Sequence, residues 1–119
     1  MPVNKKTNLG QIKISDEAIS TLVGTQVNEC YGVVGMTSKN MLKDGVNALL
    51  KKENYSKGVV ITNEKDGLKI ELYVVLCYGV KISEVVASIQ QRVKYVVEKT
   101  LAMDVESVNV FVEGIIVNG

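Results

Sequence analysis

The side chains that most often carry catalysis or bind metals are scarce in this sequence. The 119-residue chain contains no His, so it lacks the commonest general base and the commonest metal ligand. Its two cysteines, Cys30 and Cys77, do not complete a zinc site within one chain by the usual ligand sets when His is absent. We therefore predict no catalytic, cofactor-binding or metal-binding residues, and a protein that is not an enzyme.

The cysteines stand in two identical tetrapeptides, Cys30-Tyr31-Gly32-Val33 and Cys77-Tyr78-Gly79-Val80. The residues that flank the two copies differ, which favours coincidence, or two similar turns, over an internal repeat. Two interpretations of the thiols remain open, a redox switch and buried thiols in a cytosolic protein. No His, Lys or Arg flanks Cys30 to lower the pKa of its thiol, so we favour the second interpretation.

A third short pattern, Gly32-Val33-Val34-Gly35, has the GxxG spacing of a KH nucleic-acid-binding loop and falls between two predicted helices. A loop that grips a nucleic-acid backbone is expected to be polar or basic, whereas paired valines favour a strand. The formal net charge of +1 gives no electrostatic reason to expect nucleic acid as a partner. We keep a KH-like module only as an alternative.

The longest two-residue hydrophobic period in the chain covers residues 67–79 and predicts a long strand. Alternate side chains of a strand point to opposite faces. The predicted core face contains Leu68, Ile70, Leu72, Val74, Leu76 and Tyr78. The second face contains Lys69, Glu71, Tyr73, Val75 and Cys77. This second face begins polar and becomes apolar, so we expect its first half to be exposed to solvent and its second half to be covered.

Other periodicities predict the remaining elements. A strand over residues 9–14, with Ile12 and Ile14 facing inward, precedes a helix that Ser15 caps, in which Gly24 requires a packing reason. We then predict a strand at 29–36, a helix at 39–52, a connector at 54–58, a strand at 58–62 and a turn at 63–67. After the long strand come a helix at 83–101, with Ser83 as its N-cap, and a strand at 105–117 with a bulge at Gly114.

This order, β-α-β-(α)-β-β-α-β, predicts an α+β fold: a two-layer sandwich whose mixed β-sheet has helices mainly on one face. We expect a flexible N-terminus at residues 1–8 and a single domain at residues 9–119. The N-terminus is polar, and no apolar run reaches the length of a membrane-spanning helix. The expected localisation is cytoplasmic, or membrane-peripheral through a partner.

Four ordered stretches resemble the alkaline shock protein family, the envelope stress response proteins of Gram-positive bacteria. They cover residues 10–15, 29–36, 72–85 and 107–114, and together the resemblance extends over residues 9–117. The segments 38–45 and 52–56 resemble the short single-domain subgroup, which lacks charged extensions. The resemblance implies a link to alkaline and cell-envelope stress, self-association, and contact with a membrane-anchored protein in the larger members. It implies no catalytic residues.

We therefore expect a non-catalytic interaction or scaffold protein that binds itself and protein partners. An apolar second sheet face and a Val-rich last strand would supply the surface. The candidate interaction or packing residues are Tyr31, Gly32, Gly35, Tyr73, Val75, Tyr78, Gly79 and Phe111. An accessory subunit of a metabolic kinase, acting on a lipid or a small molecule, remains a further alternative.

Overall fold

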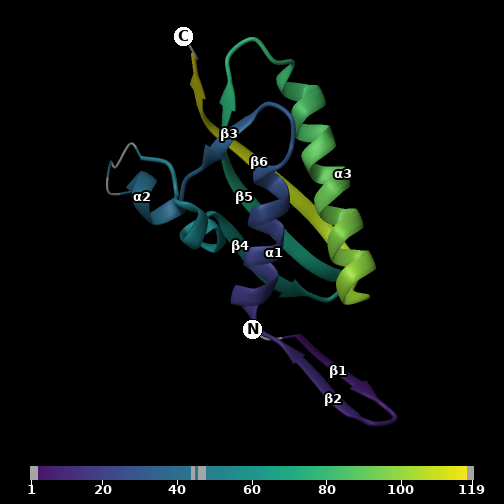
Figure 1. Ribbon diagram of the computed structural model, residues 1–119. Coiled ribbons are helices and arrows are strands. Elements are labelled where there is room, and N and C mark those ends of the chain that lie inside the picture. The colour runs from purple at the N-terminus through teal and green to yellow at the C-terminus, as the bar shows by residue number, and fades with distance from the viewer. Residues whose placement is uncertain (1–2, 44, 46–47, 118–119) are drawn as a thin grey trace.

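The structure is a computed structural model that describes residues 3–43, 45 and 48–117 (Figure 1). Its elements follow in order along the chain: β1 (Val3–Thr7), β2 (Gly10–Ile14), α1 (Asp16–Asn28), β3 (Val33–Met36), α2 (Lys39–Lys43), the 3-10 helix η1 (Lys52–Gly58), β4 (Val59–Glu64), β5 (Gly67–Cys77), α3 (Ile82–Leu101) and β6 (Val105–Ile116). The predicted α+β class is confirmed.

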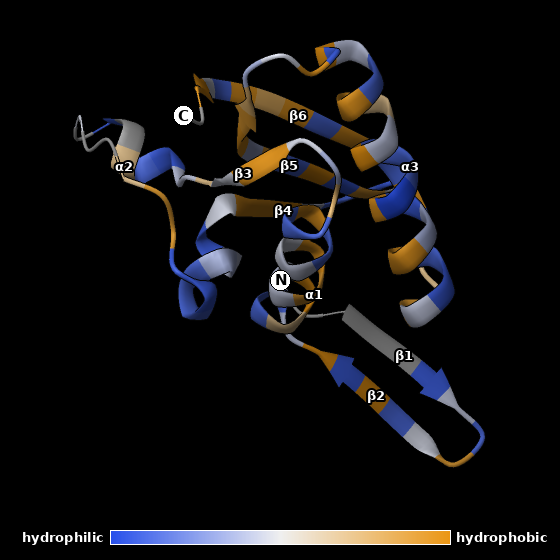
Figure 2. Ribbon diagram, turned by 45° about the horizontal axis from the view of Figure 1, so that its top comes forward, coloured by the Kyte–Doolittle hydropathy of each residue, from blue (hydrophilic) through white to orange (hydrophobic). Residues whose placement is uncertain are grey.

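The main sheet is built around β5. Its first half pairs antiparallel with β4, its second half pairs antiparallel with β3, and its whole length pairs in parallel with β6. The sheet is therefore mixed, and β6 forms one of its edges. Helices α1 and α3 lie on the same face of this sheet, which confirms the predicted two layers (Figures 1 and 2).

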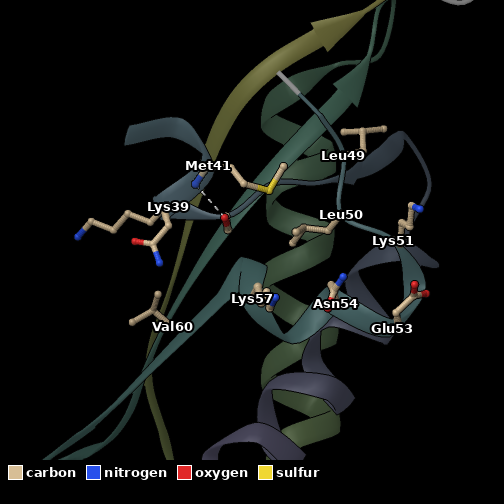
Figure 3. A pocket seen from close by; sticks show the side chains of 11 residues that line it. Lys39, Met41, Leu49, Leu50, Lys51, Glu53, Asn54, Lys57 and Val60 are labelled. Carbon is tan, nitrogen blue, oxygen red and sulfur yellow. Dashed lines mark hydrogen bonds between the residues drawn. The ribbon is translucent and has the colours of Figure 1, made fainter. Parts of the chain in front are cut away.

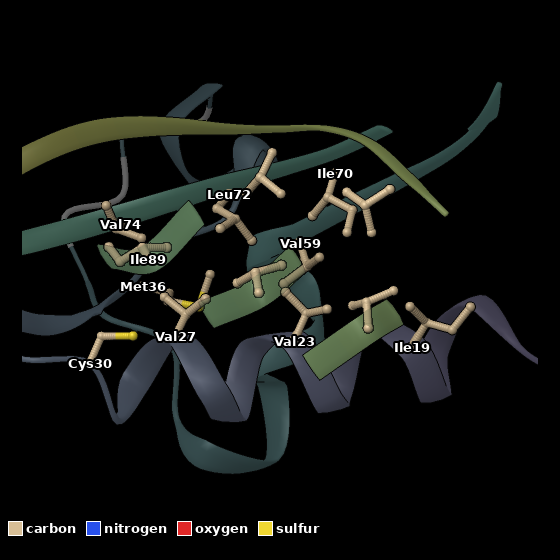
Figure 4. Packing of buried hydrophobic residues seen from close by; sticks show 14 of the residues in the cluster. Ile19, Val23, Val27, Cys30, Met36, Val59, Ile70, Leu72, Val74 and Ile89 are labelled. Atoms are coloured by element: carbon tan, nitrogen blue, oxygen red, sulfur yellow. The ribbon is translucent and has the colours of Figure 1, made fainter. Parts of the chain in front are cut away.

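The core lies between these helices and the inner face of β5 (Figure 4). Strand alternation places a run of five aliphatic side chains on this face, and all of them are fully buried: Leu68, Ile70, Leu72, Val74 and Leu76. Helix α3 contributes four buried residues at helical spacing, Val85, Ile89, Val93 and Val97. Because β-branched residues have modest helix propensity, this packing is what holds α3 in place.

Local signals explain the start of α1 and its internal glycine. The Ser15 hydroxyl accepts a hydrogen bond from the Ala18 N–H at 3.1 Å, as the sequence predicts for an N-cap. A Cβ on Gly24 would lie 3.0 Å from both the Cβ and the carbonyl oxygen of Tyr55 in η1. The packing reason expected for Gly24 is therefore the close approach of η1 to α1.

Two predictions for the middle of the chain are wrong in extent. Strand β3 begins only at Val33, because residues 29–32 turn out of α1. The predicted helix at 39–52 is short: α2 ends at Lys43, and positions 44, 46 and 47 lie outside the described residues. The Leu50 N–H donates to the Met36 carbonyl at 2.8 Å, which draws this segment alongside β3 in a non-helical conformation. The expected connector at 54–58 belongs to η1.

The ends of two further elements differ from the prediction. Tyr78 does not belong to the core face, because β5 ends at Cys77 and the Tyr78 side chain is 69% exposed. Helix α3 begins at Ile82 with Lys81 in the N-cap position, so Ser83 lies inside its first turn. The predicted bulge in the last strand is confirmed, since the register of β5 and β6 shifts from Val112 to Gly114.

The N-terminal region also differs from the prediction. No strand is predicted before residue 9, yet β1 and β2 form a separate two-stranded hairpin that projects from the body (Figure 1). Ile12 does not face the core: it is 48% exposed, because β2 pairs only with β1 and lies beyond the reach of the main sheet. Ile14 packs against the core where the hairpin joins α1. The flexibility of residues 1–8 and the domain boundary at residue 9 stay predictions.

Candidate interaction surface

The face of β5 that points away from α1 and α3 carries an aromatic and aliphatic cluster. Tyr73 and Val75 point to this face and are buried, while Lys69 and Glu71 before them are half-buried. The rings of Tyr73 and Phe111 stack with their centroids 5.2 Å apart and an interplanar angle of 18°. Phe111 remains 39% exposed, so part of this cluster faces solvent.

Neighbouring residues extend the cluster. Gly35 is the register partner of Val75, and a Cβ on Gly35 would lie 3.1 Å from the Leu49 Cδ1. Ile116 is the register partner of Cys77 and therefore shares the outer face. Both Leu49 and Ile116 are exposed. We call this set the outer patch; it comprises Leu49, Tyr73, Val75, Phe111 and Ile116.

The environment of Tyr73 acts on its hydroxyl. Burial raises the pKa of Tyr73 above its ordinary value of 10.0, and the negative charges of Glu71 and Glu113 raise it further. The phenol therefore stays protonated at mildly alkaline pH. A neutral hydroxyl keeps the outer patch uncharged in that range.

The two Cys-Tyr-Gly-Val tetrapeptides lie side by side at one end of the sheet. The Cys77 N–H donates to the Gly32 carbonyl at 2.9 Å. Gly32 and Gly79 have φ angles of +86° and +95°, a left-handed conformation that favours glycine. Both tetrapeptides therefore contain a turn with a left-handed glycine. Tyr31 is 84% exposed, and together with Tyr78 it forms what we call the tyrosine end.

The outer patch and the tyrosine end adjoin each other. The Tyr78 N–H donates to the Ile116 carbonyl at 2.9 Å, so the last residue of β6, which belongs to the outer patch, is hydrogen-bonded to the tyrosine end. The candidate residues therefore divide into two adjacent groups: Gly35, Tyr73, Val75 and Phe111 at the patch, and Tyr31, Gly32, Tyr78 and Gly79 at the end.

Sequence reasoning missed Leu49 and the exposed apolar residues that follow Gly114. The sequence pattern places Leu49 on the face of the predicted helix at 39–52, but the observed α2 ends at Lys43. The signal for the other group is the run Gly114-Ile-Ile-Val117, which is apolar on both faces of a strand. Such a run in a solvent-exposed edge strand indicates a surface rather than a core.

The thiol of Cys30 fits the buried-thiol interpretation. Both cysteines are reduced, and Cys30 is buried with its Sγ 3.4 Å from the Gln26 carbonyl oxygen. Burial raises the pKa of the Cys30 thiol; Arg92 lowers it by a smaller amount, and Glu29 adds a smaller increase. A raised pKa reduces the thiolate fraction on which redox exchange depends.

The GxxG segment is not a KH-like loop. Val33, Val34 and Gly35 lie in β3, and Gly32 immediately precedes this strand. A Cβ on Gly32 would lie 2.9 Å from the Val85 Cγ2. The two glycines therefore allow close packing against Val85 and Leu49. This agrees with the strand interpretation of the sequence.

An open hollow of about 790 Å³ lies between α2, η1 and β4 (Figure 3). Met41, Leu50 and Val60 contribute apolar surface to it, and exposed side chains such as Lys51 and Glu53 stand on its rim. The Ser38 hydroxyl accepts from the Met41 N–H at 3.0 Å and so caps α2.

Across residues 3–43, 45 and 48–117, no cluster of three or more His, Cys, Asp or Glu could hold a metal ion.

Comparison with known proteins identifies the family. Residues 4–117 match the model of the alkaline shock protein 23 family, which is described as having a cell envelope-related function. The chain belongs to this family. The resemblance of the four sequence stretches is therefore confirmed. No solved structure matches the chain.

Members of the alkaline shock protein family similar to this chain occur in two Gram-positive bacteria. The uncharacterized protein YloU of Bacillus subtilis is 44% identical, with 97% of this chain and 96% of YloU covered. The uncharacterized protein Spy1614 of Streptococcus pyogenes is 47% identical, with 100% and 98% covered. A second Bacillus subtilis relative, the uncharacterized protein YqhY, is 30% identical, with 94% and 82% covered.

The family is described as having a cell envelope-related function, so the helices were compared with the requirements of a membrane-spanning helix. Within the part of the chain that the structure describes, no helix combines the length and apolar character needed to cross a membrane. Helix α3, the longest, is amphipathic, with one buried stripe and an exposed opposite side.

Proposed function

We propose that this protein is a non-catalytic cytoplasmic scaffold of the alkaline and cell-envelope stress response, which acts by binding itself and protein partners. Contact with the membrane would come through a membrane-anchored partner. The family supports the link to the envelope. The observation that carries the mode of action is the outer patch together with the adjoining tyrosine end.

This surface has the composition of a protein interface. Aromatic side chains are enriched in the cores of interfaces, and they bury large areas at low entropic cost. Here Phe111, Tyr31 and Tyr78 present aromatic surface to solvent, while the Tyr73 ring stacks on Phe111 and Tyr73 and Val75 are buried. A contiguous apolar surface on one face of a small domain is a mark of association.

The chemistry of the described residues also supports a binding role over catalysis. The sequence contains no His, and both groups with resolved pKa shifts, Cys30 and Tyr73, are shifted toward their neutral forms. A catalytic base or thiolate nucleophile requires the opposite shift for these groups.

A matched pair of substitutions tests the proposal. Phe111→Lys places a charge in the outer patch, whereas Tyr95→Lys places one at an exposed aromatic position on α3, where Tyr95 is 64% exposed. We expect a wild-type mass above that of the monomer in light scattering, a lower mass for Phe111→Lys and no change for Tyr95→Lys.

Affinity capture from the native host completes the test. A membrane protein or a second family member that is captured by wild type and by Tyr95→Lys, but lost with Phe111→Lys, is the expected result. A strictly monomeric wild type with no such partner contradicts the proposal. A single soluble enzyme at matched stoichiometry would indicate an accessory subunit, and RNA-processing partners would indicate a nucleic-acid-related role that does not use a GxxG loop.

A further inference from the structure

Strand β6 leaves one backbone edge open. It pairs with β5 on one side, and the described residues supply no strand on its other side. Side chains of α3 cover only its beginning: the Glu98 carboxylate accepts from the Val105 N–H at 3.2 Å, and the Gln90 amide donates to the Val108 carbonyl at 2.9 Å. Beyond Val108 the strand continues to Ile116 with exposed apolar side chains.

Natural proteins usually protect such an edge with Lys, Pro or a short strand. Strand β6 is 12 residues long and contains neither Lys nor Pro. Its charged residues are two glutamates, Glu106 and Glu113. An open edge with this composition is suited to accept a strand that carries positive charge.

The hairpin of β1 and β2 has complementary features. Its two strands are each five residues long and pair only with one another. A two-stranded hairpin on its own is marginally stable in water. Residues 3–14 contain three lysines, Lys5, Lys6 and Lys13, and no acidic residue. Ile12 is 48% exposed on β2, so the hairpin also presents an apolar side chain to solvent, whereas Ile14 packs against the core of its own chain.

We infer that the β1–β2 hairpin of one copy adds to the open half of β6 in a second copy, with Ile12 of the hairpin continuing the outer patch. The inference deepens the proposed function and rests on it. Figure 1 shows the hairpin and the C-terminal end of β6 at opposite ends of the molecule, so the hairpin reaches another copy rather than its own edge.

Charge decides between this contact and the pairing of β6 with β6. An antiparallel β6 pair centred on its open half would bring Glu113 of the two copies close together, and like charges across strands are destabilising. The hairpin brings lysines to the same edge. A contact between two different surfaces is heterologous, so each copy keeps one unused hairpin or edge for the next copy.

Disulfide cross-linking tests the inference. In a Cys77→Ser background, one preparation carries Ile12→Cys and another carries Phe111→Cys; the remaining native thiol, Cys30, is buried. After mild oxidation, we expect a cross-linked dimer in the mixture of the two preparations and none in either preparation alone. Both positions are partly exposed, and circular dichroism verifies that each variant folds.

Charge reversal provides the second arm. Lys13→Glu and Glu113→Lys are each expected to weaken self-association by roughly fivefold, as one lost surface ion pair allows, and the double variant is expected to recover most of the loss. Lys99→Glu, an exposed lysine of α3, is the control and is expected to leave the association constant unchanged.

The outcomes separate the inference from the proposed function. Association with self-cross-linking of Phe111→Cys would show β6 paired with β6, and self-cross-linking of Ile12→Cys would show exchange of hairpins. Either result, or association with no cross-link in the mixture, overturns the inference and leaves the proposed function standing. A wild-type protein that is monomeric at all concentrations overturns both.

Discussion

The two faces of β5 have opposite relations to the rest of the molecule. The inner face contacts α1 and α3, and its side chains from Leu68 to Leu76 are fully buried aliphatic groups. The outer face has no helix from this pair; the Tyr73 and Phe111 rings stack on it, and Leu49 approaches it at Gly35. The inner face therefore provides stability, whereas the outer face leaves apolar side chains exposed for the binding role proposed above.

Truncation of the inner face should have the largest effect. Leu72 is fully buried at the centre of β5, so Leu72→Ala removes packed methyl groups and leaves a cavity. We expect the free energy of unfolding to fall by about 2–5 kcal/mol, measured by urea denaturation. A loss below that of an exposed-site control such as Thr21→Ala would break the assignment of stability to this face.

A substitution in the helix layer that adds an atom, instead of leaving a cavity, should have a smaller effect on stability. Gly24→Ala improves intrinsic helix propensity, by about 1 kcal/mol, but its new Cβ meets the Tyr55 backbone at 3.0 Å. We expect overpacking to outweigh propensity, with a net loss of roughly 1–2 kcal/mol. A stabilised variant in the same urea experiment would show that η1 moves away from α1 easily.

The outer face should respond differently to truncation. Phe111→Ala removes the stack on Tyr73, at a cost of about 1 kcal/mol in the free energy of unfolding. Its effect on self-association should be greater than that of Leu72→Ala when both are compared as folded proteins by sedimentation. Equal effects of the two variants on association would remove the distinction between the faces.

Alkaline pH should produce the smallest effect, and it samples both faces. Burial raises the pKa values of Cys30 and Tyr73 above their ordinary values of 9.0 and 10.0. Above these ordinary values the unfolded chain releases protons that the folded chain still holds, so stability falls as pH rises.

We therefore expect these two groups to leave the urea midpoint unaffected well below pH 9 and to lower it as the pH rises above their ordinary pKa values of 9.0 and 10.0. Cys30→Ala should remove the earlier part of the fall, and Tyr73→Phe should remove the later part. A midpoint that rises through this range would contradict the direction of both shifts. The same raised pKa values argue against either group as a direct sensor of mild alkalinity.

The sequence predicted the inner face well because two-residue alternation is a local pattern that burial enforces along a strand. The same pattern misplaced Tyr78, because the end of β5 depends on the turn at Gly79 and not on periodicity. The helix predicted through residue 52 failed because a long-range hydrogen bond from Leu50 to Met36 competes with helix formation. A hydrophobic period within one segment carries no information about such a distant partner.

The candidate surface was predictable only in part, for a related reason. Tyr73, Val75 and Phe111 alternate within strands, so their shared face follows once β5 and β6 pair in register. The parallel pairing of β5 with β6 joins segments that are far apart in the sequence, so neither strand indicates its partner. The hairpin of β1 with β2 is formed by two short strands whose sequences are largely polar. Leu49 joined the outer patch through Gly35, a contact that neither segment indicates alone.

Hydrogen–deuterium exchange of the full chain at low and high protein concentration tests the central claim most directly. The account predicts that backbone amides in β6 beyond Val108, and in the β1–β2 hairpin, exchange more slowly at high concentration, while the exposed side of α3 does not change. Slower exchange confined to α3, or exchange that is independent of concentration everywhere, would contradict the assignment of association to the outer face and its edge.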